Sequence, residues 1–348
     1  MRYKEFAIES YELDEEISLS KYDPEVKKVI LTGMVKALND VYVAYWADDD
    51  EYENSKKEYN KGNTEKFYKL MEVDLLNFVS YEVNDALFAL GHRIEPALQE
   101  VEPKLLKDNI GGYAQGYEIV MNRKVMVEIT SLICKVIRNK VEKKYVIGEL
   151  LKGLYSVVEE MIENGGVDLL EFSDLKKAIN EYASTFIHEL VHIIQHARQK
   201  HRGGKFEFRS HLDKEKNEFA KLARKNSVFP SDDSASSSPK LSSEERARYY
   251  NLYFASTAEI AAHAHNIALG IIRRYYLEQP RPTKSAYIDQ GNNALRDITR
   301  LIDGYLDKRY KGKTDPKVQA VYKRYHKLVY QEVYKFIQDT LNTANFKA

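Results

Sequence analysis

Apolar residues recur along most of this chain at the spacing of amphipathic helices. Between residues 26 and 46 they fall every three or four positions, at Val29, Ile30, Met34, Val35, Leu38, Val41 and Val43. The same period predicts helices from Thr64 towards Leu98, over 131–163 and over 174–200, and from Ser242 to about residue 340. The chain is therefore expected to be mainly α-helical.

One segment has the period of two that is typical of β-strands. Apolar residues alternate with smaller or polar ones at Tyr113, Tyr117, Ile119 and Met121, and again at Val125, Val127 and Ile129. We predict a β-hairpin here, with its turn at Asn122-Arg123. The predicted fold class is thus α+β, mainly α-helical, with a small antiparallel hairpin or sheet and flanking helices.

Residues that end or begin a helix are clearest in the second half of the chain. Asn164-Gly165-Gly166 is a helix terminator, and Ser242 with Glu245 is a capping box that opens a helix. The serine-rich residues near 227–241 are expected to form a mobile surface insertion.

Composition and charge narrow the setting. Hydrophobic residues make up 43% of the chain and charged residues 30%, which is typical of a soluble globular protein. No apolar run approaches the roughly 20 residues that span a bilayer, the N-terminus shows no export signal, and the single cysteine, Cys134, is expected to be a buried thiol. These features favour a cytoplasmic location and exclude a membrane partner.

The charges balance overall but are unevenly spread. Lys plus Arg and Asp plus Glu both number 53, while residues 1–60 are acidic and residues 271–348 are basic. With a pI near 7.1 and no recognition motif, nucleic-acid binding is not expected. The oligomeric state stays open.

The main candidates for metal ligands and for a general base lie in the motif His188-Glu189-Leu190-Val191-His192. On a helix, the spacing of four residues places both imidazoles on one face, where they can hold the same metal ion. Glu189 is then expected to face a zinc-activated water as general base. The alternative is two ordinary histidines on an amphipathic helix, but a partly buried group of two histidines and a glutamate is costly unless paired or metal-bound.

A catalytic zinc ion normally has three protein ligands and one open position, so a third ligand is needed. His196 is unsuitable because eight residues of helix rise about 12 Å from His188. The better candidate is Glu259, which small residues surround, with His263 one turn later as the alternative. Glu259 also fits a capping box with Ser256, in which its carboxylate bonds back to the helix start.

This combination resembles the gluzincin class of zinc metallopeptidases. The motif His188-Glu189-x-x-His192 followed by Glu259 on a helix is similar to that class, and Tyr253-x-x-Ser256-x-x-Glu259-Ile260 is similar to the second helix of small intracellular and phage-encoded members. The resemblance covers roughly residues 111–275. It implies His188, His192 and Glu259 as zinc ligands, Glu189 as general base, and a hairpin edge that holds an extended substrate. Many gluzincins have an aspartate four residues after the ligand glutamate, where this chain has His263.

The function expected from the sequence is zinc-dependent hydrolysis of peptide bonds in a protein or peptide substrate. The candidates for donating to the oxyanion are Tyr249, Tyr250, Tyr253, His263 and His265, of which Tyr253 and His263 are preferred. The predicted regions are a helical one at 1–108, a zincin-like metallopeptidase core at 109–275, and a helical one at 276–348. The rival hypothesis is a non-catalytic helical binding or assembly protein whose metal is structural or absent.

Overall fold

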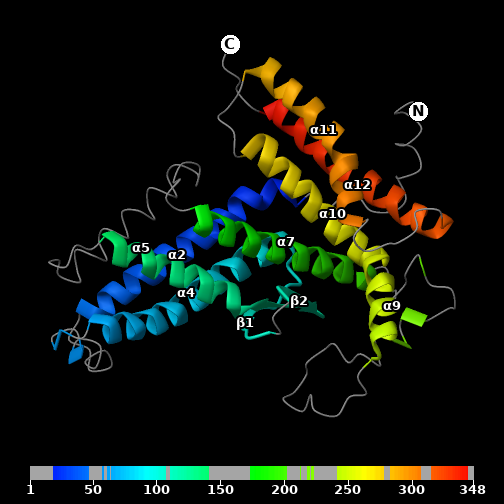
Figure 1. Cartoon of the computed structure of the whole chain (residues 1–348). Coiled ribbons are helices and arrows are strands. Elements are labelled where there is room, and N and C mark those ends of the chain that lie inside the picture. Colours follow the sequence, from blue (N-terminus) through cyan, green and yellow to red (C-terminus); the bar gives the residue numbers. More distant parts are fainter. Residues whose placement is uncertain are drawn as a thin grey trace. The chain divides into compact units, whose positions relative to one another are not determined.

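The computed structural model describes residues 19–46, 57–58, 61–62, 64–106, 110–140, 173–201, 212, 218–219, 221–222, 241–277, 283–306 and 315–343. Within these residues the chain is mainly α-helical with one small three-stranded mixed sheet (Figure 1). The helical terminator at 164–166 and the insertion near 227–241, apart from Leu241, lie outside the described residues. No helix in the described part of the chain has the length and apolar character that a membrane crossing requires.

Contacts between residues divide the chain into two compact units. One is Tyr22–Ala197, and the other consists mainly of residues from Arg198 onward. The regions expected from the sequence, with boundaries near 108 and 275, remain a prediction.

The first unit is built on two long helices, α2 (Asp23–Trp46) and α4 (Thr64–Ile94), which lie side by side and follow η1 (Ser20–Tyr22). The helices approach closely at Gly33, where an added Cβ would lie 2.9 Å from the Cα of Val83. Both helices confirm the periodicity of the sequence, and α4 ends a few residues before the position expected.

The sheet follows α4 and consists of β1 (Glu100–Lys104), β2 (Gly112–Gln115) and β3 (Glu118–Asn122), in the order β1-β3-β2. Strand β3 pairs antiparallel with β2 and parallel with β1, so the sheet is mixed rather than antiparallel. Strand β1 contains Pro103, which an edge strand tolerates because one side of it needs no donor.

The hairpin exists, but its turn is not at Asn122-Arg123. The chain reverses at Gly116-Tyr117, where Gly116 has a φ of +61° that favours glycine. Asn122 instead ends β3 and opens α5 (Arg123–Lys140), because its side-chain oxygen accepts the backbone N–H of Lys124 at 3.0 Å. The prediction of a strand from the alternation of Val125, Val127 and Ile129 is therefore wrong.

Helix α5 buries a helical stripe rather than alternate residues. Its buried apolar side chains are Met126, Ile129, Ile133 and Cys134, at spacings of three, four and one. Cys134 is a buried free thiol, as the sequence predicted.

Helix α7 (Ser173–His201) carries the histidine motif and is fixed by contacts with α4. The hydroxyl of Tyr182, which is completely buried, donates to Oδ1 of Asn84 at 3.0 Å. Burial raises the pKa of this phenol well above its ordinary value. One turn later, the Phe186 ring packs where Gly91 has no side chain, since an added Cβ there would lie 3.3 Å from the ring.

The second unit contains the helices α9 (Ser243–Phe254), α10 (Thr257–Ile272), η4 (Arg273–Leu277), α11 (Lys284–Leu306) and α12 (Pro316–Thr343). Helix α12 lies against both α10 and α11 around an apolar core (Figure 1). The predicted capping box of α9 is confirmed: Ser242 accepts the N–H of Glu245, and the Glu245 carboxylate accepts the N–H of Ser242.

Candidate metal centre

The two histidines of the motif face one another on α7. Nε2 of His188 lies 3.2 Å from Nε2 of His192, and the ring centroids are 4.9 Å apart. Two nitrogens bound tetrahedrally to one zinc at 2.0–2.1 Å would be separated by roughly 3.3 Å. The helix therefore presents two nitrogens at a spacing that one ion can bridge.

A third side chain on α7 contacts His192. Nδ1 of His192 lies 3.3 Å from Oε1 of Gln195, three residues further along the same helix. An amide oxygen can only accept, so this hydrogen bond requires the proton on Nδ1. Nε2 is then left with the lone pair that a metal needs.

Glu259 begins α10, in a position defined by a helix cap. The hydroxyl of Ser256 accepts the backbone N–H of Glu259 at 3.3 Å, and Ser256 is itself 4% exposed. The cap uses the backbone of Glu259 and does not involve its carboxylate. The residue Glu259 is 6% exposed, and a carboxylate so deeply buried requires a compensating charge or hydrogen bonds.

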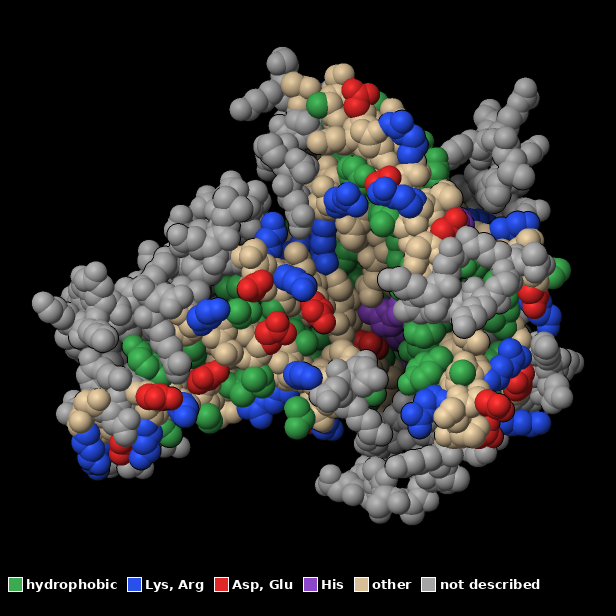
Figure 2. Space-filling view, viewed as in Figure 1, with side chains coloured by type: hydrophobic (Ala, Val, Ile, Leu, Met, Phe, Trp, Pro, Cys, Tyr) green, Lys and Arg blue, Asp and Glu red, His purple; other side chains and the backbone are tan. Residues whose placement is uncertain are grey.

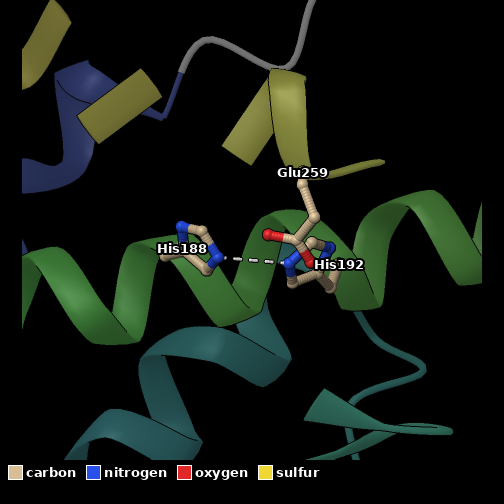
Figure 3. A group of neighbouring side chains, drawn as sticks. All are labelled: His188, His192 and Glu259. Carbon is tan, nitrogen blue, oxygen red and sulfur yellow. Dashed lines mark hydrogen bonds between the residues drawn. The ribbon is translucent and has the colours of Figure 1, made fainter. Parts of the chain in front are cut away.

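These three side chains form one group. His188, His192 and Glu259 each offer a ligand atom, and the three atoms lie within 4.8 Å of one another (Figure 3). Figure 3 shows the Glu259 carboxylate directed at the two imidazoles. The chain thus contains a buried set of two histidines and one glutamate that can hold a metal ion.

Glu189 is buried next to His188, with 6% of its surface exposed. It shares α7 with Ile187, Leu190 and Val191, all of which are buried. The structure thus buries the carboxylate that the sequence predicts as general base, and this role remains a prediction.

His263 lies one turn beyond Glu259 on α10. Its Nε2 is 3.5 Å from a carboxylate oxygen of Glu259, and its ring contacts those of Phe254 and Tyr305. The group that can share one ion contains Glu259 and not His263. His263 is therefore placed beside a candidate ligand rather than among the candidate ligands.

The other candidate donors differ in their surroundings. Tyr253 is partly buried in an aromatic cluster with Phe219, Tyr249 and Phe254. His265, two residues after His263, turns to α12, where its Nδ1 lies 3.6 Å from the buried carboxylate of Glu332. The role expected for Tyr253 remains a prediction.

The hairpin runs alongside the motif helix. An added Cβ at Gly112 would lie 3.1 Å from the Thr185 side chain, and the Tyr117 ring meets the His196 ring at a centroid distance of 5.0 Å. Thr185 precedes His188 by one turn and His196 follows His192 by one turn. The part of α7 that carries the histidine pair is therefore flanked at both ends by contacts with the hairpin.

Three features in and around this centre were not predicted from the sequence. Gln195 lies three residues after His192, a spacing at which helix side chains meet, so its contact could have been anticipated. The hairpin turn at Gly116-Tyr117 could have been recognised from the glycine. The contact between Gly112 and Thr185 joins distant segments, and no local pattern indicates it.

Comparison of the chain with protein-family models, with curated proteins and with solved structures finds no match. The resemblance to gluzincins accordingly remains a prediction from the sequence motif, and the structure adds a group of three side chains that could hold a metal ion.

Proposed function

We propose that this protein is a zinc-dependent metallopeptidase of gluzincin type. The observation that carries the proposal is the convergence of His188, His192 and Glu259, whose ligand atoms lie within 4.8 Å of one another. Two imidazoles and one carboxylate are a ligand set typical of catalytic zinc in peptidases.

The donor set fits a catalytic ion better than a structural one. Structural zinc sites are closed by four protein ligands, whereas catalytic sites have three and keep one position open. Among the residues that the structure describes, the group has three members. When bound, zinc supplies Lewis acidity that makes water a nucleophile near neutral pH and polarises a carbonyl group.

The side chains of this chain then divide the proton chemistry. Glu189 accepts a proton from the attacking water and delivers it to the leaving amine, as a general base that becomes a general acid. In this proposal the Glu259 carboxylate is occupied as a ligand, so the two glutamates have separate roles. His263 and Tyr253 are the proposed donors to the developing oxyanion.

The edge strand β2 supports an extended peptide as the substrate. The carbonyl of Gly111 accepts the N–H of Asn122 at 2.8 Å, so Gly111 faces β3. Because antiparallel pairing alternates, Tyr113 and Gln115 also face β3, while Gly112 and Ala114 direct their backbone groups to the other side. Within the described residues no strand pairs with that side of β2. We propose that the substrate backbone does.

Neither charge sign dominates the face of the molecule shown in Figure 2, where acidic and basic side chains are interspersed among the described residues. Selection of substrate by a broad electrostatic field is thus not part of the proposal. We propose instead that backbone pairing and the shape of the site select a protein or peptide substrate in the cytoplasm.

A proline at position 114 tests substrate pairing. Ala114→Pro removes only an outward-facing N–H, so the ladder between β2 and β3 stays intact. Loss of one buried hydrogen bond costs about 1–3 kcal/mol, so kcat/KM for zinc-loaded protein on unfolded casein should fall by at least about fivefold. Ala114→Gly keeps the N–H and is the matched control. Equal kcat/KM for Ala114→Pro, Ala114→Gly and wild type would contradict the pairing.

A further inference from the structure

The two ring nitrogens of His192 face different side chains. His192 has a side-chain neighbour on its own helix, Gln195, at 3.3 Å from Nδ1. Nε2 of His188 faces Nε2 of His192 at 3.2 Å. The two rings meet edge to face, with an interplanar angle of 80°.

Donor and acceptor roles follow from the chemistry of the amide. If Oε1 of Gln195 accepts from Nδ1 of His192, the neutral ring carries no proton on Nε2. The short contact between the Nε2 atoms then needs its proton on His188. In the metal-free protein, His192 is thus in the tautomer that binds metal, and His188 is in the other one.

We propose that Gln195 is the positioning residue of the metal centre. It holds His192 in the tautomer in which Nε2 carries no proton and is directed at the ion. The proposal rests on the proposed metal site and adds a residue to it. A metal ion bound at Nε2 would require the proton of His188 to be on Nδ1, where His192 already carries its own. Gln195 is a neutral acceptor, so it fixes the ring without adding negative charge to a group that already includes Glu259.

The spacing on α7 explains why Gln195 can do this. Residues three apart lie on the same side of a helix, and His192 and Gln195 are both partly buried. Another glutamine, Gln199, lies one turn further along the same helix and is a matched comparison for Gln195.

The experiment compares wild type with Gln195→Leu, Gln195→Glu and Gln199→Leu. Imidazole nitrogen NMR of the metal-free proteins at pH 8 reports which nitrogen of His192 carries the proton. Zinc affinity is measured separately by competition with a chelator.

Wild type, Gln195→Glu and Gln199→Leu should show His192 protonated on Nδ1 and His188 protonated on Nε2. Gln195→Leu should lose the single tautomer and bind zinc about 10–100-fold more weakly, the usual effect of removing an outer-shell partner. Gln195→Glu should keep the zinc affinity of wild type because it keeps an acceptor oxygen.

Two outcomes would overturn the proposal: an unchanged His192 tautomer in Gln195→Leu, or zinc affinity in that variant equal to that of wild type. Failure of the metal site itself would be distinguishable, because wild type would then bind no zinc while the metal-free tautomers would still report on Gln195.

Discussion

Helices α7 and α10 supply the same centre in different ways. Helix α7 carries His188, Glu189, His192 and Gln195 within eight consecutive positions, so helix geometry alone brings the two imidazole nitrogens to 3.2 Å. Helix α10 supplies Glu259 from its first turn, where a cap by Ser256 sets the backbone. One half of the centre is thus made by local periodicity, and the other half by the point at which a helix begins.

Because their side chains are positioned in different ways, the two helices should respond differently to substitution. Changes on α7 act on proposed ligands that the helix itself places, so loss of a single imidazole should be severe. Changes near Glu259 act both on a ligand and on a helix start.

Removing either imidazole should abolish tight zinc binding. His188→Ala and His192→Ala each leave two of the three ligands, and hydrolysis should be lost with the metal. His201→Ala, at the exposed end of the same helix, is the control and should bind zinc normally. The measurement is zinc titration of purified protein; tight binding by both imidazole variants would refute the ligand assignment.

Glu189→Gln should keep the zinc and the fold but lower turnover by roughly 10²–10⁴-fold, the typical contribution of a general base. The amide has nearly the shape of the carboxylate but cannot accept the proton. Kinetics on unfolded casein with metal-loaded protein measures the effect. Turnover close to that of wild type would place the base elsewhere.

Glu259→Ala and His263→Ala distinguish a ligand from its neighbour. His263 lies 3.5 Å from the Glu259 carboxylate, so its removal should cost about 10–100-fold in zinc affinity or activity. Glu259→Ala should lower zinc affinity by more than that range. If His263→Ala proved the more damaging of the two, the assignment of the third ligand would have to be reversed.

Tyr182→Phe should loosen α7 without touching a ligand. The substitution leaves Oδ1 of buried Asn84 without the hydroxyl that donates to it, at a cost of about 1–3 kcal/mol in the free energy of unfolding. Urea denaturation of the metal-free protein measures the change. A free energy of unfolding equal to that of wild type would show that this hydrogen bond contributes nothing net.

Ser256→Ala and Ser242→Ala remove one helix cap each and should have the smallest effects. Each cap is worth about 0.5–2 kcal/mol. Only Ser256 holds the backbone of Glu259, so only Ser256→Ala should also weaken zinc binding. Equal zinc affinities in the two variants would show that the cap of α10 does not position the ligand.

Sequence patterns predicted the helical part of this molecule well because helix periodicity is local. The motif helix was predicted over 174–200 and is found at Ser173–His201. The capping box at Ser242 and the burial of Cys134 were predicted for the same reason.

The sheet was harder because its pairing is not local. Strand β1 pairs in parallel with β3, although β2 lies between them in the sequence. No alternation of apolar and polar residues in Glu100–Lys104 indicates that partner. The stretch after Asn122 alternated as a strand would, yet the Asn122 side chain opens a helix there. The approach of Glu259 to the histidines is likewise a tertiary feature, which the sequence offered only as the preferred alternative to His263.

X-ray absorption at the zinc edge of the purified, zinc-loaded protein shows directly which atoms bind the ion. We expect one zinc ion per chain, bound by two imidazole nitrogens at about 2.0–2.1 Å, by one carboxylate oxygen and by one light atom from solvent. The same spectrum of Glu259→Ala should lack the carboxylate contribution or show no bound zinc. A third imidazole in the wild-type spectrum, a site closed by four protein ligands, or protein that takes up no zinc would contradict the account.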